Sequence, residues 1–174
     1  MIEPETKSWT WVLERECPEC GFDASTCDAR DVAALVRANA ADWRALFAAG
    51  AIGAGRPNAT TWSTLEYACH VRDVYRVMDT RMALMLAEDD AAFANWDQDS
   101  SAVEEQYEEQ DPAVVIAELE ASADHIADRL DAITDDQWPR TGRRSDGATF
   151  TLDTIARYMV HDTVHHIWDV NQNA

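Results

Sequence analysis

Glycine and proline are scarce in this sequence, which has only 6 glycines and 5 prolines among 174 residues. Alanine is plentiful instead, and 47% of the residues are apolar. We find no internal repeat and no low-complexity tract, which excludes repeat and low-complexity architectures. A chain of this length and composition is typical of one soluble helical domain that buries a substantial core.

Long apolar runs and positive charge are also missing. No apolar run reaches the roughly 20 residues that cross a bilayer. The opening residues, MIEPETKSWTW, are acidic and lack an apolar signal core, so we expect a cytoplasmic rather than a secreted protein. With 14 basic and 33 acidic residues, the formal net charge is −19. Such a surface repels phosphate backbones and anionic lipids, so we expect neither a nucleic acid nor a membrane as partner.

The four cysteines are expected to be thiols or metal ligands rather than disulfides, because we expect no secretory leader. Cys17, Cys20 and Cys27 lie close together in the sequence, and only Cys69 offers a fourth thiol. A structural zinc site needs two cysteine pairs, or one pair and histidine. We therefore interpret the three neighbouring cysteines as reduced thiols in a turn, with structural zinc as the alternative.

Apolar residues at helical spacing predict four long helices, approximately at residues 28–50, 63–88, 112–133 and 151–170. The acidic, weakly periodic residues 89–111 indicate a long crossover. Residues 1–27 are predicted to be an aromatic-rich arm packed across the same domain. Together these features predict an all-α four-helix bundle over residues 28–174 with an N-terminal cysteine-containing arm.

The second predicted helix has the strongest start signal. Ser63 and Glu66 have the spacing of a capping box, in which each side chain accepts a hydrogen bond from the other residue's backbone amide. Trp62 and Tyr67 stand where a hydrophobic staple belongs. The helix is therefore expected to begin directly after Ser63.

The stretch HDTVHHIWDV (161–170) in the last helix offers two pairs of metal ligands one turn apart. At about 100° per residue, Asp162 and His166 lie beside the apolar side of this helix. His161 and His165 fall on nearly the opposite side, where we expect a dimer or loop contact. The phasing favours Asp162 and His166 for a site inside the bundle, and the other pair remains the alternative.

His70 on the second predicted helix is the natural third ligand, because it borders the apolar stripe there. Three ligands from two facing helices would leave positions open for water or substrate, as in a catalytic site. The alternative is a set of polar side chains that are hydrogen-bonded to one another near one end of the bundle.

Two stretches resemble the DinB-like superfamily, which includes mycothiol-dependent maleylpyruvate isomerases and related thiol transferases. The first is TTWSTLEYACHVRD (60–73), in which a tryptophan opens the helix and a histidine followed by Val-x-Asp comes near its second turn. The second is HHIWDV (165–170), similar to a family pattern that places a ligand on His166 and a trailing polar residue at Asp169. The same pattern places another ligand at Asp162, where relatives have histidine or glutamate.

The resemblance, which spans about residues 30–170, implies an antiparallel four-helix bundle with a divalent metal in a cavity near one end, often in a homodimer. Zinc is the implied metal, with nickel, iron and manganese as alternatives. It also implies a low-molecular-weight thiol such as mycothiol as cosubstrate, and a transferase or isomerase reaction on a small electrophile. The alternatives are a metal-dependent hydrolase, a non-catalytic bundle that binds metal or a small ligand, and an interaction protein without metal.

Four charged residues near the site have two interpretations each. Asp73 and Asp169 stand three residues after His70 and His166, a position from which each carboxylate can orient its histidine, although surface charges are the commoner case. Arg143 and Arg144 lie in the loop before the last helix. They either meet an anionic substrate at the cavity mouth or belong to a solvated loop.

Overall fold

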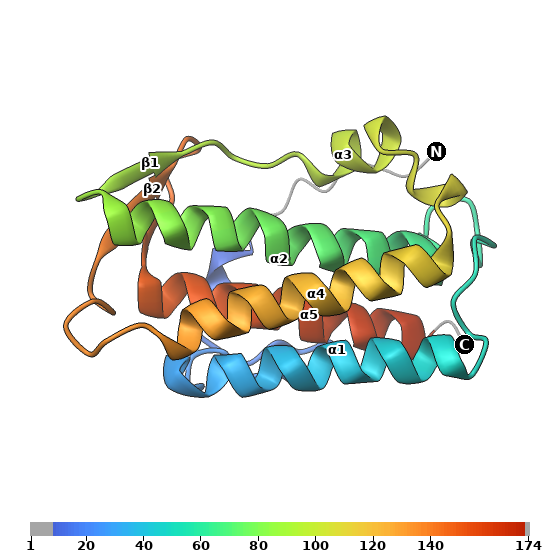
Figure 1. The fold of residues 1–174 in the computed structure, drawn as a ribbon, viewed down its shortest axis with the longest axis horizontal. Coiled ribbons are helices and arrows are strands. Elements are labelled where there is room, and N and C mark those ends of the chain that lie inside the picture. Colours follow the sequence, from blue (N-terminus) through green and yellow to red (C-terminus); the bar gives the residue numbers. More distant parts are fainter. Residues whose placement is uncertain (1–8, 173–174) are drawn as a thin grey trace.

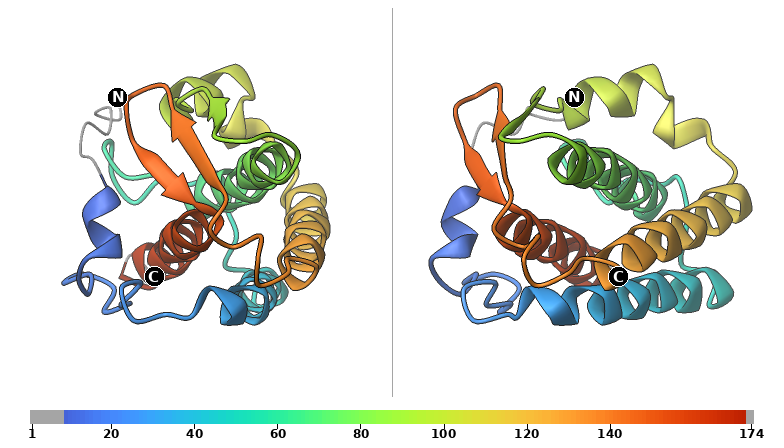
Figure 2. Two further views of the ribbon diagram at one scale, coloured as in Figure 1. Left: turned by 90° about the vertical axis from the view of Figure 1, so that its left-hand side faces the viewer. Right: turned by 60° about the vertical axis from the view of Figure 1, so that its left-hand side comes forward.

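Four long helices form the body of the molecule in the computed structural model, which describes residues 9–172 (Figure 1). Residues 1–8 of the predicted arm and residues 173–174 of the predicted bundle lie outside the described residues. The four helices are α1 (Val32–Ala48), α2 (Thr64–Ala87), α4 (Pro112–Asp131) and α5 (Leu152–Gln172). Each packs against two others, with α1 and α2 both in contact with α4 and α5. The end-on view in Figure 2 shows the bundle that these contacts produce.

Short elements fill the segments between and before the long helices. The crossover contains strand β1 (Ala91–Phe93), the short helix α3 (Gln98–Glu104) and a 3₁₀ turn at Tyr107–Glu109. Two further 3₁₀ turns, at Thr10–Leu13 and Ala29–Asp31, bracket the described part of the arm. Over residues 9–172, none of the helices has the length and apolar character needed to cross a membrane.

The capping box at the start of α2 is confirmed. Ser63 Oγ accepts a hydrogen bond from the Glu66 amide at 3.2 Å, and Glu66 Oε2 accepts one from the Ser63 amide at 2.8 Å. The rings of Trp62 and Tyr67 lie 5.6 Å apart between centroids, as the staple requires. Because this cap fixes the first turn of α2, it also fixes the height of His70 in the second turn.

The bundle core includes one polar bridge. The Tyr75 hydroxyl donates a hydrogen bond to Asn39 Oδ1 at 2.8 Å, and Asn39 Nδ2 donates one to the Thr163 carbonyl at 2.8 Å. All three residues are buried, so these bonds satisfy groups that would otherwise be costly to bury. The bridge joins α2, α1 and α5 and holds α5 in place close to Asp162.

A small three-stranded sheet corrects the all-α prediction. Strand β1 pairs in parallel with β2 (Thr141–Arg144), and β2 pairs antiparallel with β3 (Thr149–Thr151). The register places Ala91 beside Gly142 and Phe150 on the other side of Gly142. The sheet lies at one end of the bundle, beside α2 and α5, as Figures 1 and 2 show. Strands of three or four residues are too short to produce a detectable alternation of apolar residues.

Gly142 lies where the sheet packs closely against the end of α2. A Cβ atom there would lie 2.7 Å from Phe93 Cε1 and 2.8 Å from Met85 Cγ. We therefore expect Gly142→Ala to lower the free energy of unfolding by about 1–3 kcal/mol, the usual cost of overpacking. Gly55→Ala is the control, because a Cβ atom at Gly55 meets nothing within 4 Å. Urea unfolding of both variants measures the difference, and equal stabilities would contradict the prediction.

Candidate metal centre

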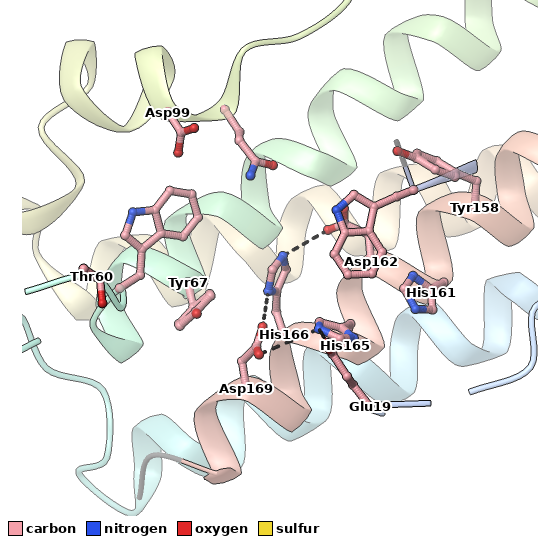
Figure 3. Close-up of a pocket in the computed structure, with 13 residues that line it drawn as sticks. Glu19, Thr60, Tyr67, Asp99, Tyr158, His161, Asp162, His165, His166 and Asp169 are labelled. Atoms are coloured by element: carbon pink, nitrogen blue, oxygen red, sulfur yellow. Dashed lines mark hydrogen bonds and ion pairs between the residues drawn. The ribbon is translucent and has the colours of Figure 1, made fainter. Parts of the chain in front are cut away.

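The start of α2 and the end of α5 lie side by side, and a pocket of about 310 Å³ opens beside them. Figure 3 shows the side chains that line it. They come from α2, α3, α5, the arm and the loop before α2. Aromatic and acidic groups dominate this lining, which includes Trp9, Glu19, Trp62, Tyr67, Asp99, Tyr158, Asp162 and Asp169. No lysine or arginine is among the described residues that line the pocket.

The structure brings together the three residues that the sequence predicts as ligands. One donor atom each from His70, Asp162 and His166 lies within 4.8 Å of the other two. Asp162 Oδ1 is 3.3 Å from His70 Nε2 and 3.4 Å from His166 Nε2. We call this group the bundle site. Two imidazole nitrogens and a carboxylate oxygen form a donor set that suits zinc or non-haem iron.

His70 is held by aromatic rings rather than by a carboxylate on its second nitrogen. Its ring is fully buried and stacks on Trp96 at 5.3 Å between centroids and an angle of 7°, with Trp62 also at 5.3 Å. Among the described residues, His70 Nδ1 has no hydrogen-bond partner. The two tryptophans therefore fix the plane of the ring and shield it from water.

His166 lies between two carboxylates, as Figure 3 shows. Its Nε2 faces Asp162, and its Nδ1 lies 2.8 Å from Asp169 Oδ2. The predicted orienting role of Asp169 therefore has the required contact. Asp73 has no such contact with His70, because its carboxylate binds Arg72 and accepts a hydrogen bond from the Tyr107 hydroxyl at 2.6 Å. The interpretation of Asp73 as the residue that orients His70 is wrong.

The protonation states of the three residues follow from burial and from one another. Burial lowers the pKa of His70, so its ring is neutral. Burial opposes ionisation of Asp162, but hydrogen bonds from His166 and His70 hold its pKa well below the usual range. Burial likewise opposes the charged form of His166, but Asp162 and Asp169 raise its pKa to about 9. A proton on His166 therefore occupies the place that a metal cation would take.

His161 and His165 are buried, although the helical period places them away from the core. They are 3% and 7% exposed, because the arm covers this side of α5. Trp9 lies against both rings, at 5.8 Å from His161 and 5.4 Å from His165 between centroids. We expect a dimer or loop contact for this pair, and in the structure the arm makes the contact. They do not join the bundle site but lie beside Cys17 and Cys20.

The remaining predicted residues lie apart from the bundle site. Arg143 pairs with Asp90, and Arg144 pairs with Asp146. Neither arginine is among the described residues that line the pocket, but the Arg144 guanidinium lies 5.8 Å from the ring centroid of Tyr158, which does line it. All four cysteines are free thiols. Cys69 is buried within the bundle, and neither it nor Cys27 joins the cluster formed by Cys17 and Cys20.

The fold and the site define a helical bundle with a candidate metal centre between two of its helices. The model of the DinB superfamily matches residues 49–170. The chain belongs to the DinB superfamily. Its structure is also similar to that of YfiT from Bacillus subtilis, described as a probable metal-dependent hydrolase with an unusual four-helix bundle topology. That match has a TM-score of 0.67 at 17% identity and covers 98% of this chain and 91% of YfiT. A search among curated proteins gave no significant match.

Proposed function

We propose that the protein is a metal-dependent enzyme whose divalent ion, zinc by preference, is held by His70 Nε2, Asp162 and His166 Nε2. The observation that carries the proposal is the convergence of these three donors, two of which, Asp162 and His166, line a pocket. Three protein ligands leave coordination positions free for a small molecule, which is the arrangement of a catalytic zinc site. A structural site would use a fourth side chain.

The ion would lower the pKa of a coordinated thiol or water and so supply a nucleophile at neutral pH. The residues around it have separate tasks. Asp169 holds His166 so that Nε2 points toward the site. Trp62 and Trp96 exclude water from the ring of His70. These contacts keep the donor atoms in place before a substrate arrives.

The favoured reaction is transfer of a low-molecular-weight thiol to a small electrophile, or isomerisation assisted by such a thiol. The pocket of about 310 Å³ suits small reactants. Its lining combines four carboxylates with no lysine or arginine among the described residues. Three of these carboxylates, Glu19, Asp99 and Asp169, would not bind the ion and would repel an anionic electrophile, so we propose a neutral or cationic one.

Hydrolysis by a metal-bound water is the second candidate. It is favoured by the similarity in fold to YfiT, which is described as a probable metal-dependent hydrolase. The two reactions need the same ligands but differ in their nucleophile. They are distinguished by whether turnover requires an added thiol.

The test is turnover measured with and without thiol, before and after chelation and restoration of zinc. Thiol and a neutral electrophile should react only with metal-loaded protein, and His70→Ala should abolish that reaction. His125→Ala is the matched control, because His125 is exposed and pairs with Asp79 far from the bundle site. Hydrolysis of neutral esters or amides without thiol would favour the second candidate. A metal-loaded protein with no turnover in either assay would contradict an enzymatic function.

A further inference from the structure

A second group of potential ligands lies where the arm crosses α5. One donor atom each from Cys17, Cys20, His161 and His165 lies within 4.8 Å of the other three. We call this group the arm cluster. Its members come from two segments that are more than a hundred residues apart in the sequence, and none of them belongs to the bundle site. Cys17, His161 and His165 are buried, and Cys20 is partly buried.

The arm is folded locally so that its two thiols are close together. The Gly21 amide donates a hydrogen bond to the Cys17 carbonyl at 2.9 Å, and the Cys17 amide donates one to the Phe22 carbonyl at 3.0 Å. Gly21 has a φ of +72°, which closes the turn directly after Cys20. These backbone hydrogen bonds lie within residues 17–22 and hold the two cysteines in one short loop.

The histidines of α5 complete the group from the other side. His165 Nδ1 lies 3.7 Å from Cys17 Sγ, while its Nε2 lies 3.3 Å from a Glu19 carboxylate oxygen. His161 is 97% buried, and among the described residues its Nε2 has no hydrogen-bond partner. A buried nitrogen without a partner is destabilising unless something binds it. The cluster therefore contains a histidine whose Nε2 is buried without a hydrogen-bond partner among the described residues.

We propose that the arm cluster is a structural zinc site with Cys17, Cys20, His161 and His165 as its four ligands. The spacings Cys-x-x-Cys and His-x-x-x-His are those of tetrahedral Cys₂His₂ zinc sites. Soft thiolates favour zinc over magnesium, calcium or manganese. On binding, each thiol releases its proton to solvent, and the two thiolates then neutralise the doubly charged cation. A site with no net charge is suited to this depth of burial.

The proposed site would fasten the arm to the bundle. The arm contributes Trp9 and Glu19 to the wall of the pocket, so its position helps to shape the bundle site. Asp169 links the two groups directly, because one of its oxygens lies 2.8 Å from His166 Nδ1 and the other lies 3.8 Å from His165 Nε2. The arm cluster has four protein ligands and no open position, so its role is structural rather than catalytic.

Metal analysis combined with cobalt substitution tests this site. We expect about two zinc ions per chain, one in each group of ligands. The double variant Cys17→Ser/Cys20→Ser should retain only the ion of the bundle site, whereas His70→Ala/His166→Ala should retain only the ion of the arm cluster. Cys27→Ser/Cys69→Ser is the matched control and should keep both ions.

Cobalt reconstitution of the wild-type chain tests whether a metal ion binds the cysteines of the arm cluster, even if the cysteine variants fail to fold. Cobalt in the arm cluster should show a near-ultraviolet charge-transfer band from thiolate sulfur, and that band should persist in His70→Ala/His166→Ala. A wild-type protein that binds cobalt without this band would overturn the proposal. So would a Cys17→Ser/Cys20→Ser variant that still holds two zinc ions. Because the two sites share no ligand, one proposal can fail while the other stands.

Discussion

Replacing Asp162 with alanine is expected to weaken zinc binding at the bundle site by more than about 100-fold. Loss of a group that merely orients a ligand already costs about 10–100-fold. Asp162 is placed to do more, because its Oδ1 lies 3.3 Å and 3.4 Å from the Nε2 atoms of both histidines. Without its carboxylate, a divalent cation would meet only two neutral nitrogens. Titration of chelator-treated protein with zinc measures the change, and the same titration in the Cys17→Ser/Cys20→Ser background follows the bundle site without the arm cluster.

Two comparison variants separate a ligand from a neighbour. Asp169→Asn should weaken binding by about 10–100-fold, because His166 would keep its ligand nitrogen but lose the carboxylate that orients its ring. Asp153→Ala should leave the affinity unchanged, since Asp153 lies on the same helix but pairs with Arg157. If Asp162→Ala bound zinc as tightly as the wild type, the assignment of the ligands would be wrong.

The sequence predicts the four helices because each has a long apolar period and identifiable ends. The predicted cap at Ser63 is seen in the structure, and α4 begins at Pro112, close to the predicted start of the third helix. The apolar stripe of α5 predicts which face of that helix is turned toward the core, and so its rotation about its axis. That rotation brings Asp162 and His166 toward His70, so the grouping of these three residues follows from periodicity. The same reasoning says nothing about which ion they bind.

The arm cluster is missed because a helical period describes one helix and not what covers it. His161 and His165 do lie away from the bundle core, but residues 9–27 pack over them. The signal was available in the sequence, as a Cys-x-x-Cys pair at Cys17 and a His-x-x-x-His pair at His161. Each pair by itself supplies only two of the four ligands of a structural zinc site. The sheet is missed for a related reason, because the pairing of its strands is not a local feature of the sequence. Strands β1 and β2 are separated by about fifty residues and meet only in the folded chain.

Removal of the Asp73 carboxylate is the second large effect that we expect, and it concerns stability rather than metal. Arg72 and Asp73 are 3% and 6% exposed and form two hydrogen bonds of 2.9 Å. Asp73→Ala would leave the Arg72 guanidinium buried and would take the acceptor from the Tyr107 hydroxyl. We expect a loss of about 3 kcal/mol in the free energy of unfolding, the lower end for a broken buried pair. The lower end applies because Arg72 keeps a contact with Glu118 at 3.1 Å.

Asp79→Ala is the matched control for this prediction, because Asp79 also lies on α2 and also pairs with an arginine. That arginine, Arg129, is partly exposed, with 26% of its side chain accessible. Partly exposed pairs of this kind contribute about 0.2–1 kcal/mol. Urea unfolding at neutral pH should therefore rank wild type, Asp79→Ala and Asp73→Ala in order of falling stability. Equal losses of unfolding free energy in the two variants would show that the buried pair stabilises the fold no more than the partly exposed one.

The pH dependence of the same pair gives a check that a packing defect would not reproduce. Burial opposes ionisation of Asp73, but hydrogen bonds from Arg72 and Tyr107 hold its pKa below the ordinary value. A carboxyl whose pKa is lower in the folded state contributes stability above its unfolded pKa of about 3.9. That contribution is lost as the pH falls through the folded pKa. The stability difference between wild type and Asp73→Asn should therefore be constant from about pH 5 to 8 and shrink below about pH 4. A difference that stayed constant into acid would mean that packing of the side chain, and not its charge, stabilises this end of the bundle.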